Sequence, residues 1–377
     1  MFPKLRFKEF DGDWLKLKYK DVLTIKYGKD HKSLNDGDIP VYGTGGLMRH
    51  VNKYLYDGES ILIGRKGTID KPKYINEKFW TVDTLFYTEI EESIVPLFLY
   101  QHALEVNWLG LNEATGVPSL NTTSIYNIDI SIPSKEEQTK IVTFLSAVDE
   151  KISQLTQKYQ LLSQYKQGMM QNLFSQQIRF KADDGSEFGE WKDKPLNEIA
   201  SKRSGKNKDG SISEVLTNSA TQGIIKQSDY FEREIVTKSN LNGYYIVNLD
   251  DFVYNPRISV HAPVGPIKRN KKCLGVMSPL YTVFTVIQGN LKYLEYFFDS
   301  NFWHDYVKGV ANSGARHDRM NITNKDFFDM PILYPCLEEQ TKIANFLSAI
   351  DQKIEVVAQQ IEQAKTWKKG LLQQMFV

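Results

Sequence analysis

The chain has only two cysteines among its 377 residues, Cys273 and Cys336. Two thiols alone cannot form a metal site, and so few cysteines in so long a chain are typical of a reducing compartment. The sequence also lacks any apolar run near the roughly 18 residues that a membrane-spanning helix needs, and its N-terminus lacks the apolar stretch of a secretion signal. We therefore expect a cytoplasmic protein.

An excess of either charge is also missing, since 47 lysines and arginines face 46 aspartates and glutamates and leave a net charge of +1. Such a chain does not bind polyanions through bulk charge, so any nucleic-acid binding must come from local basic patches. The length is large for one hydrophobic core and is sufficient for two domains with connecting helices.

Recognisable catalytic motifs are missing as well. The glycines of 42–50 are not followed by the Gly-Lys-Ser/Thr of a phosphate-binding loop. The Asn-Pro pair at 255–256 resembles the start of an adenine-methylase motif but lacks its second proline and the aromatic residue that stacks a flipped base. His50, His261 and His317 have no partner at metal-ligand spacing. We predict no catalytic residues, no metal site and no cofactor in this chain.

What the sequence does contain is a long internal repeat. The segment EEQTKIVTFLSAVDEKI at 136–152 returns without a gap as EEQTKIANFLSAIDQKI at 338–354, an offset of 202 residues. The match continues more weakly through YKQGMMQNLF at 165–174 and WKKGLLQQMF at 367–376. Two copies at one fixed offset indicate a duplicated unit.

Both copies predict a long helix with the narrow apolar seam of a coiled coil, because their apolar residues recur at spacings of four and three. Lys166 and Lys368 interrupt the two seams at the same place, where a polar residue can fix register or mark a fork between the helices. Ser134 and Glu137 form a candidate capping box before the first helix, whereas the second copy has Cys336 there. The ten positions assigned to the helix pairing are Ile141, Leu145, Val148, Ile152, Lys166, Ile343, Leu347, Ile350, Ile354 and Lys368.

A weaker repeat precedes each globular segment. LRFKEFDGDW at 5–14 resembles IRFKADDGSEFGEW at 178–191, which directly follows the first helix. Because the second helix runs to Val377, it would lead back to Leu5 if the chain were a circle. The sequence thus predicts two tandem units, each a globular domain followed by a helix, in a circular pseudo-twofold repeat whose two long helices pair antiparallel.

The globular segments predict two mixed α/β domains (fold class α/β, or α+β). Each has short runs rich in Ile, Val, Tyr, Phe and Thr, bounded by Gly, Pro, Asn and Asp, which favour strands. The strand candidates are 59–64, 79–90, 244–256 and 278–287, and aromatic, helical stretches follow at 95–105 and 291–307. The predicted boundaries are 1–134 for the first domain, 135–177 for the first helix, 178–336 for the second domain and 337–377 for the second helix.

Loops on these sheets are the candidates for recognition. They are 42–50, 63–68 and 115–121 in the first domain, and 216–223, 254–260, 267–272 and 313–321 in the second. Arg and Lys can pair with guanine, Asn and Gln with adenine, and Ser and Thr can hold phosphates. A single basic turn is more often a solvated hairpin, but both domains carry such loops. The candidate DNA contacts are Thr44, Arg49, His50, Arg65, Lys66, Thr68, Ser119, Asn121, Thr217, Asn218, Gln222, Asn255, Arg257, Ser259, Lys268, Arg316, His317 and Arg319.

Two variable globular segments that alternate with two near-identical helices resemble the specificity subunit of type I restriction–modification systems. The resemblance covers nearly the whole chain, and its most specific part is the helical LSA.D..I core of 136–152 and 338–354. It implies that 1–134 and 178–336 are target recognition domains, each reading one half of a bipartite DNA sequence in the major groove. The helix pair would set the gap between the two halves.

The resemblance also implies partners. Two modification subunits, which bind S-adenosylmethionine and methylate adenine, would dock on the helices at 136–174 and 338–376, including the ten paired positions. Two restriction subunits would use ATP and Mg²⁺ to translocate and cut DNA. The chain itself would then be a non-catalytic subunit of that complex.

Three other interpretations stay open at this point. The helix pair could bridge two protein-binding domains in a scaffold that does not bind DNA. The chain could be a nuclease or methylase with divergent motifs, which would require a cofactor pocket. It could also be the specificity subunit of a related system with a fused nuclease–methylase. Basic loops gathered on one face would favour DNA recognition over the scaffold.

Overall fold

The computed structural model describes residues 3–230, 238–312 and 318–376. The chain divides into two compact units, and each long helix contributes to both: unit 1 comprises Met1–Lys158 and Val357–Val377, and unit 2 comprises Tyr159–Val356. No helix in the described stretches is long and apolar enough to cross a membrane.

Unit 1 is built on a six-stranded sheet with the order β2-β7-β5-β6-β3-β4, antiparallel except for the β3–β6 pair. Side chains of β5 alternate between two cores, since Ile61 and Ile63 join one apolar cluster and Leu62 joins another. The strands are β2 (Leu23–Tyr27), β3 (Ile39–Gly43), β4 (Gly46–Val51), β5 (Tyr56–Gly64), β6 (Lys73–Thr81) and β7 (Leu85–Ile90).

Helix α2 (Pro96–Glu105) packs on this sheet, because its buried Phe98 and Leu99 share the core of Ile61 and Ile63. Pro96 at the first helical position has a backbone that suits a helix start. The remaining elements of unit 1 are α1 (Tyr19–Val22), α3 (Thr122–Tyr126), the 3₁₀ helix η1 (Trp108–Leu111) and the antiparallel pair β1 (Leu15–Lys18) with β8 (Asp129–Ile132).

Unit 2 is built on a four-stranded antiparallel sheet with the order β10-β17-β14-β15, flanked by three two-stranded pairs, β11-β12, β13-β16 and β9-β18. Its core is aromatic, with Phe252 of β14 stacked on Phe284 of β17 at 5.6 Å between ring centroids. The strands are β9 (Lys192–Pro195), β10 (Ala200–Lys202), β11 (Leu216–Ser219), β12 (Gly223–Lys226), β13 (Tyr245–Val247), β14 (Phe252–Tyr254), β15 (Ile267–Arg269), β16 (Gly275–Met277), β17 (Thr282–Val286) and β18 (Pro331–Tyr334).

The predicted helical stretch at 291–307 is interrupted, which corrects the expectation of one element. It forms α7 (Leu291–Asp299) and α8 (His304–Val310), and Ser300 between them has extended backbone angles while its hydroxyl donates to Phe297 O at 2.6 Å. A serine that bonds its own backbone in this way competes with helix continuation. The other helices of unit 2 are α5 (Leu196–Ile199), α6 (Gln227–Tyr230), α9 (Asn324–Phe328) and the 3₁₀ helix η2 (Lys238–Gly243).

The two repeated segments form the long helices α4 (Lys135–Phe174) and α10 (Leu337–Met375), as predicted. In unit 1 the first turns of α4 share a core with the last turns of α10, for example Leu145 with Leu371. In unit 2 the last turns of α4 share a core with the first turns of α10, for example Leu173 with Leu347. The helices therefore pair antiparallel, which confirms the predicted arrangement.

The start of α4 corrects the predicted capping box in part. The Ser134 hydroxyl accepts a hydrogen bond from the Glu137 amide at 3.3 Å, which is the expected cap. The Glu137 side chain, however, turns away from the cap and bonds to Arg6. Only half of the box is formed, because the carboxylate has a stronger, cationic partner.

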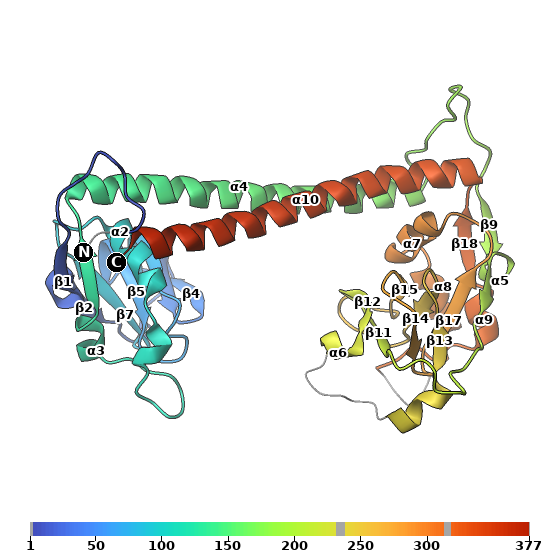
Figure 1. Ribbon diagram of the computed structural model, residues 1–377, viewed down its shortest axis with the longest axis horizontal. Helices are drawn as coiled ribbons and strands as arrows, with labels where there is room; N and C mark the ends of the chain where they lie inside the picture. The colour runs from blue at the N-terminus through green and yellow to red at the C-terminus, as the bar shows by residue number, and fades with distance from the viewer. Residues whose placement is uncertain (1–2, 231–237, 313–317, 377) are drawn as a thin grey trace. The chain divides into compact units, whose positions relative to one another are not determined.

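The predicted circular closure is present in unit 1. The amide of Leu5 donates to Gln374 O in the last turn of α10 at 2.9 Å, and Figure 1 marks both chain ends in this unit. In unit 2, where the chain is continuous, the equivalent amide of Ile178 donates to Asn172 O of α4 at 3.2 Å. The N-terminal segment thus meets the end of α10 as residue 178 meets the end of α4.

The repeat is more extensive in the structure than in the sequence. After α2, Trp108 Nε1 donates to Ala103 O at 2.8 Å, and after α7, Trp303 Nε1 donates to Phe298 O at 3.1 Å. Likewise β9 pairs with β18 in the same antiparallel manner as β1 with β8. One framework is therefore built twice, largely from different residues.

Candidate nucleic-acid interface

The second glutamate of the first EEQTKI copy anchors the N-terminal segment to α4. Glu137 is 2% exposed and accepts hydrogen bonds from Arg6 Nε and Nη2, both at 2.7 Å, and from Trp14 Nε1 at 3.3 Å. The bond to the carboxylate raises the pKa of the Arg6 guanidinium above its usual range. A buried carboxylate is tolerated here because a cation and an indole together satisfy it.

Unit 2 repeats this anchor. Glu339 is 0% exposed and accepts from Arg179 Nε at 3.0 Å, from Arg179 Nη2 at 2.7 Å and from Trp191 Nε1 at 2.9 Å. The Glu-Arg-Trp set explains why the weak repeat at 5–14 and 178–191 accompanies the strong one. In each copy of the weak repeat, the Arg and the Trp donate hydrogen bonds to the buried glutamate of the long helix that follows in the sequence.

The glutamine of each copy holds the domain helix. Gln138 Oε1 accepts from the Val95 amide, and Gln340 Oε1 accepts from the Asn290 amide, both at 2.8 Å. Val95 and Asn290 are the N-cap residues of α2 and α7. The second glutamate and the glutamine of each EEQ segment therefore serve the interior of the unit, whereas the first glutamate is exposed.

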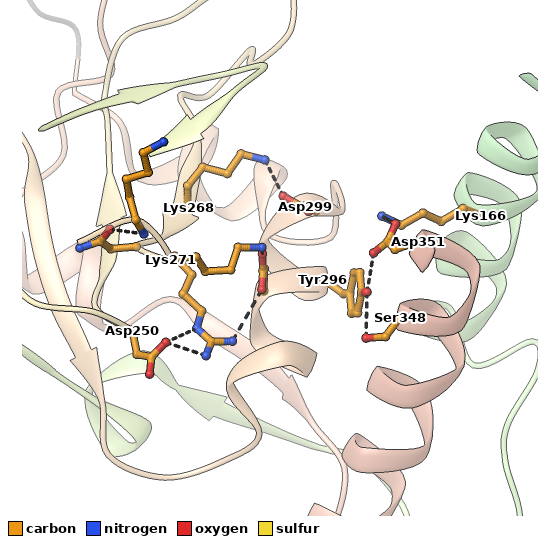
Figure 2. Close-up of polar contacts among 12 residues, drawn as sticks. Lys166, Asp250, Lys268, Lys271, Tyr296, Asp299, Ser348 and Asp351 are labelled. Atoms are coloured by element: carbon orange, nitrogen blue, oxygen red, sulfur yellow. Dashed lines mark hydrogen bonds and ion pairs between the residues drawn. The ribbon is translucent and has the colours of Figure 1, made fainter. Parts of the chain in front are cut away.

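Lys166 and Lys368 each pair with an aspartate of the other long helix. Lys368 Nζ lies 2.7 Å from Asp149 in unit 1, and Lys166 Nζ lies 2.6 Å from Asp351 in unit 2. The second pair is visible in Figure 2, where the Tyr296 hydroxyl also donates to Asp351. Burial raises the pKa of Tyr296, and its bond to Asp351 adds to this shift. The seam interruptions are thus interhelical ion pairs that favour one register.

Reversing one of these pairs gives a test. Lys368→Asp places two carboxylates together, and we expect the double variant Lys368→Asp/Asp149→Lys to recover most of the lost stability, with a coupling energy of about 0.5–3 kcal/mol. Denaturant unfolding of the four proteins of the cycle measures it. The exposed pair Lys365–Glu362 within α10 is the matched control, with about 0.3–0.5 kcal/mol expected. Equal coupling in both cycles would contradict a role in register.

The other positions assigned to the helices lie inside the units. Ile141, Leu145, Val148, Ile343, Leu347 and Ile350 are buried, and Ile152 and Ile354 are partly buried against the same cores. A docked partner could not reach most of these side chains. The most exposed aromatic residues of the helices are different ones: Trp367 is 55% exposed, and Tyr165, at the equivalent position of the repeat, is 52% exposed.

Three predicted loops meet in unit 1. The turn after β5 pairs with the loop before α3 through a bridge between Lys66 and Ser119. The β3–β4 turn lies beside them, because the Thr44 hydroxyl stands 3.5 Å from where a Cβ on Gly67 would be. Gly67 has a φ of +93°, which a glycine adopts without strain. Thr68 is partly buried in the same turn.

Cations gather at this meeting point. Arg65 donates to Asp83 O at 3.1 Å and lies over the Tyr27 ring at 5.4 Å from its centroid. Lys73 Nζ is 3.4 Å from where a Cβ on Gly46 would be. Among the described residues, the cations Arg65, Lys66, Lys32 and Lys73 have no carboxylate at ion-pair distance, and we call these four residues the basic face of unit 1.

A groove of about 710 Å³ adjoins the basic face and is lined by Lys32, Thr44 and Thr84, among others. Its charge is mixed, since Asp30 and Asp83 also line it. Sequence reasoning missed Lys32 and Lys73. Neither lies in a predicted loop: Lys32 lines the groove together with Thr44, and Lys73 reaches from β6 to Gly46, the first residue of β4.

The remaining candidates of unit 1 have structural partners or other positions. Segment 42–50 is mostly strand, not loop, because β3 and β4 are joined by a two-residue turn. Arg49 on β4 is paired with Asp36 at 2.6 Å, while His50 on the same strand is exposed. Asn121 caps α3 by accepting from the Ser124 amide at 2.7 Å.

In unit 2, residues from three of the four predicted loops line one groove of about 620 Å³, and the loop at 267–272 does not take part. The groove brings together the β11–β12 hairpin, the segment after β14 and the chain at 318–321, which the sequence separates by up to a hundred residues. Thr217, Arg257, Ser259 and Arg319 were predicted, whereas Gln227, Ser278 and Tyr281 were not. Their side chains give a wall of hydroxyl, amide and guanidinium groups, which is the chemistry of base-edge recognition.

Two predicted candidates hold this groove together from inside. Asn218 is 3% exposed and donates to Val253 O at 2.7 Å and Pro266 O at 3.2 Å. Asn255 Nδ2 donates to Asn218 O at 3.0 Å. The side-chain NH2 groups of both residues are therefore used within the protein. Gln222 is exposed near the tip of the hairpin.

The basic run at 267–272 is neutralised. Lys268 Nζ lies 2.6 Å from Asp299 of α7, and Arg269 lies 2.7 Å from Asp250, as Figure 2 shows around the labelled Asp250 and Lys268. Lys271 pairs with Glu295 at 2.5 Å. Phosphate binding by these side chains would first have to break ion pairs, so we do not include Lys268 in the candidate interface.

Arg316 and His317 lie outside the described residues. Within the described ranges, no group of three or more His, Cys, Asp and Glu side chains is arranged to hold a metal ion.

One framework built twice, with a different set of loops on each copy, defines a class of protein: a two-unit adaptor whose units share a framework and differ in their loops.

The chain matches the family model of the type I restriction modification DNA specificity domain twice, over residues 11–164 and over 189–366. It therefore belongs to this family and is a type I specificity subunit that recognises DNA sequence. The two matches correspond to the two copies of the framework.

Relatives and solved structures agree with this assignment. A chain assigned as the MjaX specificity subunit of Methanocaldococcus jannaschii is 28% identical over 422 aligned positions, covering 98% of this chain and 94% of the relative. The MjaVIII specificity subunit of the same organism is 25% identical over 339 positions, covering 84% and 76%. The crystal structure of a type I S subunit from M. genitalium has the same fold, with a TM-score of 0.59, 13% identity and coverage of 100% and 99%.

Proposed function

We propose that each unit reads one half of a bipartite DNA target, and that the α4–α10 pair sets the gap between the halves. The carrying observation is the contrast between the two copies. The anchors Arg6–Glu137 and Arg179–Glu339 repeat, whereas the basic face of unit 1 and the groove of unit 2 have no residue pattern in common. A framework that is repeated, with DNA-facing loops that differ between its two copies, suits two different half-sites.

The partners follow from the same contrast. Two copies of one methyltransferase subunit require two equivalent docks, and the long helices supply them. Trp367 packs edge-on against Phe144 at 6.1 Å beside a groove of about 380 Å³, and Tyr165 occupies the equivalent position in unit 2. Exposed aromatic side chains next to an apolar groove are frequent anchors of protein interfaces.

The assembled complex would bind S-adenosylmethionine on its modification subunits and would use ATP with Mg²⁺ on two restriction subunits. The chain itself is the non-catalytic component. Because its net charge is only +1, much of the phosphate neutralisation would come from the partners, and binding by the isolated chain would be weak.

Exchange of residues 1–134 for the same segment of a relative tests modular reading. We expect one half of the selected sequence to change completely and the other half, with the gap, to stay the same, because unit 2 and the helix pair are retained. Selection from random duplexes by the chain co-assembled with an adenine-methylating subunit measures this. A change in both halves would contradict the proposal.

A further inference from the structure

Arg257 has an unusual position among the cations of unit 2. It lines the 620 Å³ groove, its side chain is exposed, and no carboxylate of the described residues lies at ion-pair distance from it. Nearby cations differ. Lys226 lies 2.6 Å from Glu214, and Arg319, whose backbone pairs with that of Arg257, has its Nε 3.8 Å from Asp318.

The backbone that carries Arg257 is fixed on both sides. Its amide donates to Asn255 Oδ1 at 3.0 Å, and Asn255 is bonded in turn to Asn218. The amide of Met320 donates to Pro256 O, and the amide of Ile258 donates to Asp318 O, both at 2.9 Å. Because the backbone around Arg257 is already held by hydrogen bonds, less conformational entropy is lost when its guanidinium binds a ligand.

The surroundings favour a base over a phosphate as the partner. Arg319 is the other arginine of this groove, but most polar side chains around Arg257 are neutral: the hydroxyls of Thr217, Ser259 and Tyr281 and the amide of Gln227. Phosphate contacts usually come from clustered, outward cations such as the basic face of unit 1. An arginine without an ion-pair partner, set among hydroxyl and amide groups, matches the donors and acceptors of a base edge.

We infer that Arg257 determines specificity in unit 2 by donating two hydrogen bonds, from its guanidinium, to O6 and N7 of one guanine in the major groove. Asn255 and Asn218 are positioning residues that hold its loop. The inference rests on the proposed reading of one half-site by each unit and adds the residue and the base.

The test compares Arg257→Ala and Arg257→Lys in the full chain, co-assembled with the adenine-methylating subunit, by selection from random duplexes and by binding titrations at several salt concentrations. We expect both variants to lose discrimination at one guanine of one half-site, by about 5- to 150-fold, because lysine keeps the charge but lacks the planar fork. The other half-site should be unchanged. Lys208→Ala, which removes an exposed cation outside the groove, should leave both halves unchanged.

Other outcomes overturn the inference in distinct ways. If Arg257→Lys retains full discrimination and Arg257→Ala weakens all sequences equally with a salt slope smaller by about one, Arg257 contacts phosphate. If the wild-type complex selects two blocks and neither variant changes either block, Arg257 does not read DNA, although the proposed function stands. If the wild-type complex selects no sequence, the proposed function fails as well.

Discussion

Replacing Arg179 by alanine is expected to lower the free energy of unfolding of unit 2 by about 3–5 kcal/mol. The Glu339 carboxylate is 0% exposed and accepts three hydrogen bonds, two of them from Arg179 and one from Trp191. Without the guanidinium, the carboxylate would keep only the bond from Trp191 and would remain a buried charge without a counterion. Amide hydrogen exchange followed by mass spectrometry measures the effect, because peptides of the two units are resolved separately.

A matched control lies on the same helix. Lys342 of α10 forms an ion pair with Asp183, whose side chain is 93% exposed, and exposed pairs contribute only about 0–1 kcal/mol. Lys342→Ala should therefore change exchange in unit 2 very little. If Arg179→Ala and Lys342→Ala had the same small effect, Glu339 would not be the anchor that its burial indicates.

The long helices could be predicted from the sequence because their signal is local and doubled. Seam spacing predicts a coiled coil, and the near-identity of 136–152 with 338–354 predicts two equivalent elements. The duplication inside the globular domains could not be predicted in the same way. There the framework keeps shapes and hydrogen bonds, such as those of Trp108 and Trp303, while most of the residues between them differ.

The candidate interface was predicted only at the level of loops. Arg49 and Lys268 look like free cations in the sequence, but their partners Asp36 and Asp299 are 13 and 31 residues away and meet them only through strand pairing and packing. Asn218 looks like a base reader, but burial turns its amide inward. Residue type predicts what a side chain can bind, whereas the fold decides whether it is still free to do so.

Acidification from pH 7 to pH 4 is expected to destabilise unit 1 by about 3 kcal/mol through His102 alone. Burial in α2 lowers the pKa of His102 from 6.5 to about 4. Between these values the unfolded chain binds a proton that the folded chain does not, so stability is lost as the pH falls through this window. Well above pH 6.5 and well below pH 4 this residue adds no further pH dependence.

The residues at the equivalent positions of unit 2 show which substitutions in unit 1 make a suitable control. Phe297 stands six residues before Trp303 as His102 stands six before Trp108, and Leu196 begins α5 as Tyr19, whose hydroxyl lies 3.0 Å from His102 Nδ1, begins α1. We expect the double variant Tyr19→Leu/His102→Phe to lose this part of the pH dependence.

Both substitutions are needed, because His102→Phe alone would leave the Tyr19 hydroxyl, in a side chain that is 1% exposed, without its partner, at a cost of about 1–3 kcal/mol. Urea unfolding of the wild type and of the double variant at pH 7, 6, 5 and 4 measures the effect. The stability of the wild type relative to the variant should fall by about 3 kcal/mol across this range, with most of the change between pH 6.5 and 4. If the free energies of unfolding of the two proteins changed in parallel with pH, His102 would have the same pKa in the folded unit as in the unfolded chain. The buried imidazole would then not be the cause of the acid sensitivity of unit 1.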